Sequence, residues 1–257
     1  MNKYCVIGEQ LAHTLSPQIH KLFFENKGEI GEYGVREFAK SEILDAKSEL
    51  IKYNGFNVTI PYKQTVMSFL DDISDEAKVI GAVNTVKNID GKLYGYNTDP
   101  YGFSALLSVN GIDPCGKSAV VLGSGGAAKS VLYALSKMGV SSLMYVKRKE
   151  DEFIEGYQYI TYDNLSGVSG YLLVNATPVG MYPHTGVSPV SDDIISEFDA
   201  VADVVYNPAM TEFVRIALRL GKKACSGLYM LVAQAIGSQS IWRDESVCSE
   251  DILPIFN

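Results

Sequence analysis

The N-terminal part of the chain alternates short apolar runs with stretches whose apolar positions recur at helical spacing. The apolar runs predict strands at 3–7, 33–38 and 55–60, and a hairpin of 82–86 with 92–96 around Asp90-Gly91. The helical spacing predicts helices at 16–27, 41–52, 61–70 and 74–80. Strands that alternate with helices predict an α/β domain with a largely parallel sheet.

The same alternation continues beyond Thr98. Helices are predicted at 99–110, 127–138, 211–220 and 227–242, and strands at 119–122, 142–146, 157–161, 171–174, 200–205 and 222–225. We therefore expect two α/β domains with a cleft between them, one formed by residues 1–99 and 228–257 and the other by residues 100–227.

A glycine-rich turn separates the predicted strand at 119–122 from the helix that follows it. The segment S-A-V-V-L-G-S-G-G-A-A over 118–128 fits G-x-G-x-x-A, with small residues at Gly123, Gly125 and Ala128. Bare backbone at these positions lets a pyrophosphate approach the free N–H groups and the positive dipole of the helix N-terminus. The strand before the turn and the helix after it favour a Rossmann-like dinucleotide-binding domain over an ordinary connection.

Three consecutive cations stand where dinucleotide-binding folds select their cofactor. Arg148 follows Gly126 by 148 − 126 = 22 residues, at the end of the next predicted strand, with Lys147 and Lys149 beside it. An acidic residue at this place binds the ribose of NAD, whereas an arginine accommodates the 2′-phosphate of NADP. The sequence therefore favours NADP. The alternative is a solvated basic turn whose positive charge is neutralised by the acidic residues at 150–152.

Composition narrows the choice of partners. The chain has 257 residues, of which 47% are hydrophobic and 20% charged, and a formal net charge of −8. These values are ordinary for a globular protein, and the negative charge disfavours nucleic acid and anionic membranes. The four cysteines and three histidines show no metal-ligand spacing, and no apolar leader or membrane-length run is present. We expect a cytoplasmic protein with a small-molecule ligand and no bound metal.

Four polar segments of the first domain stand at the ends of predicted elements. They are H-T-L-S-P at 13–17, N-V-T-I-P-Y-K at 57–63, G-A-V-N-T at 81–85 and N-T-D at 97–99. Such short polar side chains can line a ligand site, but each has a structural alternative. Ser16 can cap the helix that follows it, Thr59 can be an ordinary strand residue and Lys63 a surface charge, and Asp99 can cap a helix.

In this order and wording, the segments resemble the shikimate dehydrogenase family. The resemblance continues through G-S-G-G-A-A at 123–128, N-A-T-P-V-G-M at 175–181 and G-L-Y-M-L-V-A-Q-A at 227–235, and it spans residues 6–234. It implies a substrate domain completed by the C-terminal helix and a Rossmann-like NADP domain. It also implies reversible reduction of 3-dehydroshikimate to shikimate, on the pathway to chorismate and the aromatic amino acids.

The resemblance further implies a role for individual residues, with Lys63 and Asp99 as the catalytic pair. The implied substrate-binding residues are Thr14, Ser16, Asn57, Thr59, Lys63, Asn84, Asp99, Tyr206 and Gln234. The implied cofactor-binding residues are Asp75, Gly123, Ser124, Gly125, Gly126, Ala127, Lys147, Arg148, Lys149, Val204 and Gly227. A lysine ammonium suits this chemistry because it can donate a proton to a carbonyl oxygen as hydride arrives.

Three positions depart from the family pattern. Thr14 stands where Ser is frequent, Pro100 where Gly is usual, and Lys147 where Asn is usual. The chemical groups that the reaction needs are retained, but the first two departures leave open whether quinate, with one more ring hydroxyl, is also a substrate. The alternatives are therefore a quinate/shikimate dehydrogenase and a non-catalytic NADP-binding regulator. A monomer and a homodimer both remain open.

Overall fold

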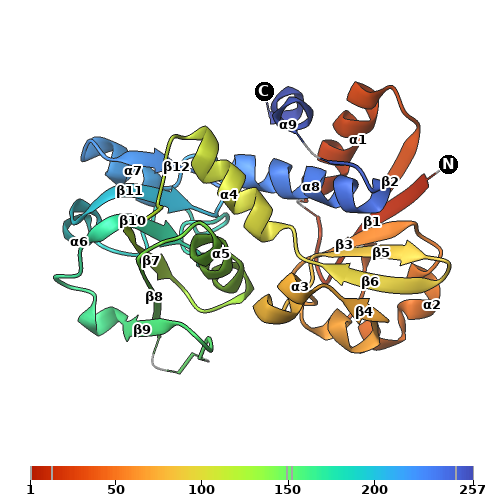
Figure 1. Ribbon diagram of the computed structural model, residues 1–257, viewed down its shortest axis with the longest axis horizontal. Coiled ribbons are helices and arrows are strands. Elements are labelled where there is room, and N and C mark those ends of the chain that lie inside the picture. The colour runs from red at the N-terminus through yellow and green to blue at the C-terminus, as the bar shows by residue number, and fades with distance from the viewer. Residues whose placement is uncertain (1, 13, 149, 152, 247, 257) are drawn as a thin grey trace. The chain divides into compact units, whose positions relative to one another are not determined.

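The computed structural model describes residues 2–12, 14–148, 150–151, 153–246 and 248–256. The chain divides into two compact units, one of residues 1–98 and 232–257 and the other of residues 99–231. Both units combine helices with a sheet, which confirms the predicted α/β class (Figure 1). Asp99 and residues 228–231 belong to the second unit.

The first unit is built on a six-stranded sheet in the order β2-β1-β3-β5-β6-β4. Its strands are β1 (Asn2–Gly8), β2 (Gly31–Glu37), β3 (Gly55–Val58), β4 (Asp72–Ile73), β5 (Thr85–Ile89) and β6 (Lys92–Tyr96). Its helices are α1 (Ser16–Lys27), α2 (Lys47–Leu50), α3 (Asp75–Ile80) and α9 (Ser249–Phe256), with 3₁₀ turns η1 (Ile43–Asp45) and η2 (Thr65–Phe69). Helix α8 (Leu228–Arg243) begins in the second unit and continues into the first.

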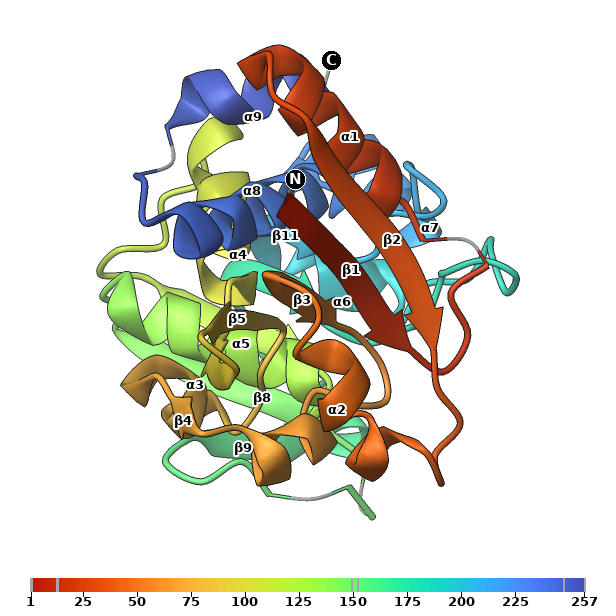
Figure 2. The same cartoon turned by 90° about the vertical axis from the view of Figure 1, so that its right-hand side faces the viewer.

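The first sheet is mixed, which corrects the expectation of a largely parallel sheet. β1 pairs in parallel with β2 and β3, and Figure 2 shows β1 and β2 side by side. β5, however, is antiparallel to both β3 and β6. The tight turn at Asp90-Gly91 makes β5 and β6 antiparallel, since its two residues have φ of 52° and 84°, as a two-residue hairpin requires. The predicted hairpin is thereby confirmed.

Four polar segments meet at one edge of this sheet. β1 and β3 are neighbours although β2 lies between them in the sequence, so residues 14–17 and 59–63 both follow carboxyl ends at that edge. The antiparallel β5 starts at the same edge, and β6 ends there before residues 97–98. Ligand sites of open α/β sheets form where the strand order reverses in this way.

Trp242 fixes helix α8 to the first sheet. Its indole stacks on Tyr4 of β1 with 4.4 Å between ring centroids, and its Nε1 donates a hydrogen bond of 2.9 Å to the Val86 carbonyl oxygen of β5. The ring also covers the backbone of Gly55 in β3. One buried aromatic side chain therefore holds three strands and a helix together.

The second unit is a six-stranded sheet in the order β12-β11-β10-β7-β8-β9, and each of its strand pairs is parallel. Its strands are β7 (Ser118–Leu122), β8 (Ser142–Lys147), β9 (Gln158–Thr161), β10 (Gly170–Asn175), β11 (Phe198–Asp203) and β12 (Lys223–Cys225). Its helices are α4 (Asp99–Val109), α5 (Gly126–Lys137), α6 (Asp192–Ser196) and α7 (Glu212–Arg219), with the 3₁₀ turn η3 (Tyr162–Asn164). This architecture confirms the predicted Rossmann-like unit.

The strand order of the second sheet reverses between β7 and β10. The chain continues from β7 to β8 and β9 on one side, and through β10 to β11 and β12 on the other. The connections after β7 and β10 therefore separate, which leaves room for a ligand at their carboxyl ends.

Two predicted helices are shorter than expected. Residues 41–52 form only η1 and α2, and 61–70 contain only η2 among the helical elements. In the first segment Ile43, Ala46 and Leu50 are buried while Leu44 and Ile51 are exposed, so the buried face is narrower than the apolar stripe that predicted a longer helix. In the second, β-branched Thr65 and Val66 lower the helix propensity.

The sequence analysis missed β4, α6 and α9. The last of these contains Pro254, a residue that ordinarily argues against a helix. Ile252 and Ile255 of α9 are buried, and the Asp251 carboxylate lies 2.5 Å from the Lys27 ammonium of α1. Tertiary packing thus outweighs the local propensity.

We expect Gly55→Ala to destabilise the protein by about 1–3 kcal/mol, the usual cost of overpacking a core. A Cβ at this position would overlap the Trp242 indole, which is itself held by Tyr4 and Val86. Urea unfolding measures the change. Gly34→Ala is the matched control, because a Cβ there meets open space in strand β2 of the same sheet; equal stabilities of the two variants would contradict the role of Trp242.

Candidate active site

A buried polar network centred on Asn57 lies at the edge of the first sheet where β1 and β3 end. Its Nδ2 lies within hydrogen-bond distance of Ser238 Oγ (2.8 Å), Thr85 Oγ1 (3.2 Å) and the Asn84 carbonyl oxygen (3.2 Å). Its Oδ1 accepts a hydrogen bond of 2.7 Å from the Tyr33 hydroxyl. The two amide protons are therefore used inside the protein, and the group that Asn57 can offer to a ligand is the second lone pair of Oδ1.

Asn84 connects this network to the end of β6. Its Oδ1 accepts hydrogen bonds of 2.8 Å from the Thr98 backbone N–H and the Thr85 hydroxyl. Its Nδ2 lies 3.0 Å from Thr98 Oγ1 and 3.4 Å from Gln234 Oε1. The structure thus brings together three of the predicted substrate-binding residues, Asn57, Asn84 and Gln234.

Thr14 and Ser16 lie together at the carboxyl end of β1. The Thr14 hydroxyl donates to Ser16 Oγ and accepts from the Ser16 backbone N–H, both at 3.3 Å. The alternative that Ser16 caps helix α1 is wrong, because the helix begins at Ser16 and Leu15 occupies the cap position. The preceding residue of this segment, His13, lies outside the described residues.

Thr59 and Lys63 follow β3 on a connection whose backbone is tied to both neighbouring segments. The Thr59 N–H donates to the Ile7 carbonyl oxygen (3.0 Å), and the Lys63 carbonyl oxygen accepts from the Val83 N–H (2.8 Å). Lys63 is half-buried.

Two other predicted substrate-site residues, Asp99 and Tyr206, belong to the second unit. Asp99 is buried as the first residue of α4. Tyr206 is half-buried, and burial raises the pKa of its hydroxyl group.

A cavity of about 610 Å³ lies in the second unit where the strand order reverses. It is lined by Gly123, Ser124, Gly125, Arg148, Asp151, Tyr162, Ala176, Thr177, Pro178, Val179 and Pro189. Gly123 has φ of 110°, a conformation that favours glycine, and α5 begins directly after the turn at Gly126. The cavity thus joins an open glycine turn, a helix N-terminus and a cation, which fits a dinucleotide.

The family model of the shikimate dehydrogenase substrate binding domain matches residues 6–86 of this chain. The chain is also 46% identical over 253 residues to the shikimate dehydrogenase (NADP(+)) of Clostridium beijerinckii, and the match covers 95% of this chain and 93% of that relative. The chain belongs to the shikimate dehydrogenase family. The predicted resemblance is thereby confirmed.

Solved structures of the family share the fold of the whole chain. Shikimate dehydrogenase 1 from Peptoclostridium difficile has a TM-score of 0.92 at 44% identity, covering 100% of this chain and 97% of that one. Shikimate 5-dehydrogenase from Thermus thermophilus, solved in complex with NADP(H) and shikimate, has a TM-score of 0.91 at 32% identity and covers 100% and 98%. Both are similar to this chain from end to end.

The predicted cofactor residues of this family member occupy different surroundings. Arg148 lines the cavity, whereas the Lys147 ammonium lies 3.6 Å from the centroid of the Phe153 ring and donates to the Asp151 carbonyl oxygen (2.8 Å). Asp75 is a fully exposed residue of the first unit, 3.8 Å from Lys78. Lys149 lies outside the described residues. The roles of these residues stay predictions.

Gly227 and Val204 pack backbone to backbone. A Cβ on Gly227 would overlap the Val204 carbonyl group, and the Gly227 N–H donates to the Val205 carbonyl oxygen (3.0 Å). This close approach requires a glycine. It fixes the start of α8 against the loop that follows β11.

The sequence analysis assigned no role to residues 176–179, although they belong to the quoted N-A-T-P-V-G-M segment. Their loop is held by Asn175, whose Oδ1 accepts from the Thr177 N–H (3.1 Å) and whose Nδ2 donates to Asp203 (3.0 Å). The buried Asp203 carboxylate also accepts from Thr211 Oγ1 (2.7 Å) and the Val205 N–H (2.9 Å). Asp203 therefore positions two loops, including one wall of the cavity.

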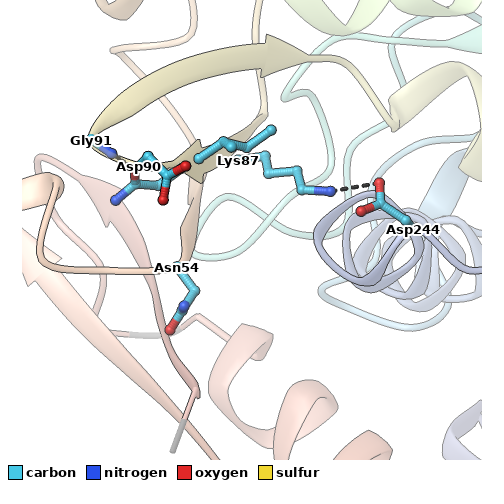
Figure 3. A pocket seen from close by; sticks show the side chains of 7 residues that line it. Asn54, Lys87, Asp90, Gly91 and Asp244 are labelled. Atoms are coloured by element: carbon cyan, nitrogen blue, oxygen red, sulfur yellow. Dashed lines mark hydrogen bonds and ion pairs between the residues drawn. The ribbon is translucent and has the colours of Figure 1, made fainter.

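A second hollow, of about 440 Å³, lies in the first unit near the hairpin turn (Figure 3). It is lined by Asn54, Lys87, Asn88, Ile89, Asp90, Gly91 and Asp244, which do not include any predicted site residue. The Lys87 ammonium lies 2.6 Å from Asp244. This ion pair ties the hairpin to the end of α8, a structural role.

Histidine, cysteine and acidic side chains are the usual protein ligands of metal ions. Among the described residues, no group of three or more such side chains is placed to hold a metal ion. In the same part of the chain, no helix is both long and apolar enough to cross a membrane.

We expect Asp203→Asn to destabilise the protein by roughly 2–4 kcal/mol at neutral pH, because an amide group replaces a carboxylate that accepts three hydrogen bonds. Urea unfolding measures the loss. Asp199→Asn is the matched control, since Asp199 is an exposed residue of the same strand. Equal stabilities of the two variants would contradict the positioning role of Asp203.

The same pair of variants gives a test of pH dependence. Burial raises the pKa of Asp203 from 3.8 to about 6, although its hydrogen bonds lower it. The native state then binds the proton more tightly than the unfolded state, so the contribution of Asp203 to stability grows as the pH falls from about 6 to about 4. The difference between the wild type and Asp203→Asn should therefore be larger near the acid end of this window than at neutral pH.

Proposed function

We propose that this chain is an NADP-dependent shikimate dehydrogenase, which reversibly reduces 3-dehydroshikimate to shikimate on the pathway to the aromatic amino acids. The observation that carries the proposal is end-to-end similarity to a family member solved with NADP(H) and shikimate, at a TM-score of 0.91. In this assignment the first unit supplies most of the substrate-binding residues and the second unit binds the cofactor. The division follows the match of the substrate binding domain to residues 6–86.

In the proposed substrate site, each polar segment has a chemical task. The paired hydroxyls of Thr14 and Ser16 bind the substrate carboxylate as hydrogen-bond donors. Asn57, Thr59, Asn84, Tyr206 and Gln234 contact the ring hydroxyls. Because Asn57 and Asn84 are held by internal hydrogen bonds, their orientation exists before the substrate binds, which lowers the entropic cost of binding.

Lys63 and Asp99 form the proposed acid–base pair. The Lys63 ammonium donates a proton to the C3 carbonyl oxygen of 3-dehydroshikimate, and the same carbon receives a hydride. In the reverse direction the Lys63 amine takes the proton from the C3 hydroxyl. Asp99 is the proposed partner of Lys63 in this pair.

The cavity of the second unit supports NADP as the cofactor, because its glycine turn and Arg148 are the groups that the two phosphate sites of this cofactor need. When bound, NADPH supplies the hydride. Gly123–Gly126 present backbone N–H groups to the pyrophosphate, and Arg148 binds the 2′-phosphate.

We also propose a cytoplasmic location. Cys5, Cys115, Cys225 and Cys248 are free thiols in the structure, as is ordinary for a protein of a reducing compartment.

The proposal is tested by initial rates of NADP reduction with shikimate, measured for the wild type and for Lys63→Ala. We expect the wild type to be active and the variant to lose roughly 10²–10⁴ in kcat, the usual contribution of general acid–base catalysis, with NADP binding retained. Lys52→Ala, an exposed lysine of the same unit, is the control. Near-normal turnover of Lys63→Ala would remove Lys63 from the mechanism, and an inactive wild type would overturn the function.

The same assay with quinate in place of shikimate tests the second candidate substrate. The observation that favours it is Thr14, whose methyl group changes the shape of the predicted carboxylate site. A kcat/KM for quinate close to that for shikimate would identify a quinate/shikimate dehydrogenase.

We expect Arg148→Asp to raise the KM for NADP by roughly 10–100-fold, because a charge-assisted hydrogen bond contributes about 1.5–3 kcal/mol. The KM for shikimate should change little. Arg219→Asp is the matched control, since Arg219 is also exposed and paired with a nearby carboxylate, that of Asp192. An unchanged KM for NADP would show that Arg148 belongs to a solvated turn.

A further inference from the structure

The carboxylate of Asp151 lies in the cavity of the second unit, bound by groups that also suit an anionic ligand. Its Oδ2 accepts hydrogen bonds from the Ser124 hydroxyl (3.0 Å) and the Arg148 backbone N–H (3.1 Å). Its Oδ1 lies 3.2 Å from an Arg148 guanidinium nitrogen. The Asp151 side chain is 21% exposed, whereas that of Arg148 is 78% exposed. Arg148 is thus already engaged by a carboxylate of its own loop.

The position of these donors indicates which group of a ligand the Asp151 carboxylate stands in for. Ser124 belongs to the glycine turn, and Arg148 follows β8 at the place where dinucleotide-binding folds read the adenosine ribose. Carboxylate and phosphate oxygens accept the same charge-assisted hydrogen bonds from a guanidinium group. The two anions therefore compete for one set of donors.

The loop that carries Asp151 is anchored beside the cavity. The Lys147 ammonium donates to the Asp151 carbonyl oxygen (2.8 Å) and lies against the rings of Phe153 (3.6 Å) and Tyr159 (4.7 Å from their centroids). Lys147 is buried. Its ammonium therefore fixes the backbone that places the Asp151 carboxylate.

We propose that Asp151 determines cofactor specificity: its carboxylate occupies the subsite of the 2′-phosphate and thereby reduces the preference for NADP over NAD. This inference rests on the proposed function of the second unit. NADP binds with displacement of the carboxylate from Arg148 and Ser124. The ribose 2′-hydroxyl of NAD, in contrast, can donate a hydrogen bond to the carboxylate where it stands.

Asp151 carries its negative charge at neutral pH. Partial burial raises the pKa of its carboxyl group, but the hydrogen bonds from the Arg148 backbone, the Arg148 side chain and Ser124 outweigh this effect and hold the pKa below its ordinary value of 3.8. The 2′-phosphate is thus opposed by a full charge as well as by a competing acceptor.

The test compares Asp151→Asn with the wild type by calorimetric titration of NADP, NAD, adenosine 2′,5′-bisphosphate and 5′-AMP. We expect the variant to bind NADP and the bisphosphate about tenfold more tightly, the effect of removing a unit charge about 6 Å from a doubly charged phosphate in water. Binding of NAD and 5′-AMP should change by less than about threefold, because the amide oxygen still accepts a hydrogen bond. Asp192→Asn is the control, since it removes the same charge from another Arg–Asp pair of this unit.

Each other outcome overturns the inference. Unchanged or weaker binding of NADP by Asp151→Asn would show that the carboxylate orders the turn and does not compete. An equal gain for NAD and NADP, or the same gain in Asp192→Asn, would show a general charge effect. These results leave the proposed function intact if the wild type reduces NADP with shikimate, whereas failure of wild type and variant to bind either cofactor would overturn both proposals.

Discussion

Both predicted ligand sites depend on the reversal of strand order within each sheet. In the first sheet, the connection after β1 leads to β2 on one side, and the connection after β3 leads to the strands on the other side. In the second sheet, the connections after β7 and β10 lead to β8 and β11, again on opposite sides. A parallel strand must be followed by a crossover, so two neighbouring strands whose crossovers diverge leave their carboxyl ends uncovered. The polar segments 14–17 and 59–63 stand at the first opening, and 123–125 and 176–179 at the second.

The polar side chains at the first opening are stabilised by one another. Burial of an amide group is costly unless its donors and acceptors are used, and Asn57 and Asn84 meet this requirement through Thr85, Thr98 and Ser238. Such a network fixes the direction of each group more firmly than a single contact does. In the second unit Asp203 has the same effect on Asn175 and Thr211. Each predicted site is thus supported by buried side chains that have no proposed ligand contact of their own. These are Thr85, Thr98 and Ser238 in the first unit and Asp203 in the second.

Local patterns predicted the elements whose causes are local. The strand, glycine turn and helix over 118–137 were predicted correctly because Gly123 needs positive φ and apolar runs flank it, and Asp90-Gly91 specified the hairpin for the same reason. Helix α9 escaped prediction because its stability comes from packing on α1, which a proline-containing segment does not reveal. The short form of 41–52 likewise reflects burial in the folded unit, whereas that of 61–70 follows from the low helix propensity of Thr65 and Val66.

The site was predicted less completely than the fold. The family resemblance named Asn57 and Asn84, but Tyr33 and Ser238, which hold Asn57, come from distant elements and carry no local signal. Three adjacent cations also look equivalent in a sequence. The structure separates Arg148, which lines the cavity, from Lys147, which packs beneath aromatic rings, and it alone shows that Asp151 folds back on Arg148.

The internal hydrogen bonds of Asn57 have a consequence for molecular recognition. Both of its amide protons point to protein oxygens, and one lone pair of Oδ1 is taken by Tyr33. Asn57 can therefore offer a ligand only an acceptor, although the asparagine side chain ordinarily both donates and accepts. A ring hydroxyl can donate to such an acceptor, whereas a ring carbonyl oxygen cannot. In the proposed site, a contact with Asn57 would thus favour the alcohol over the ketone at the ring position that it meets.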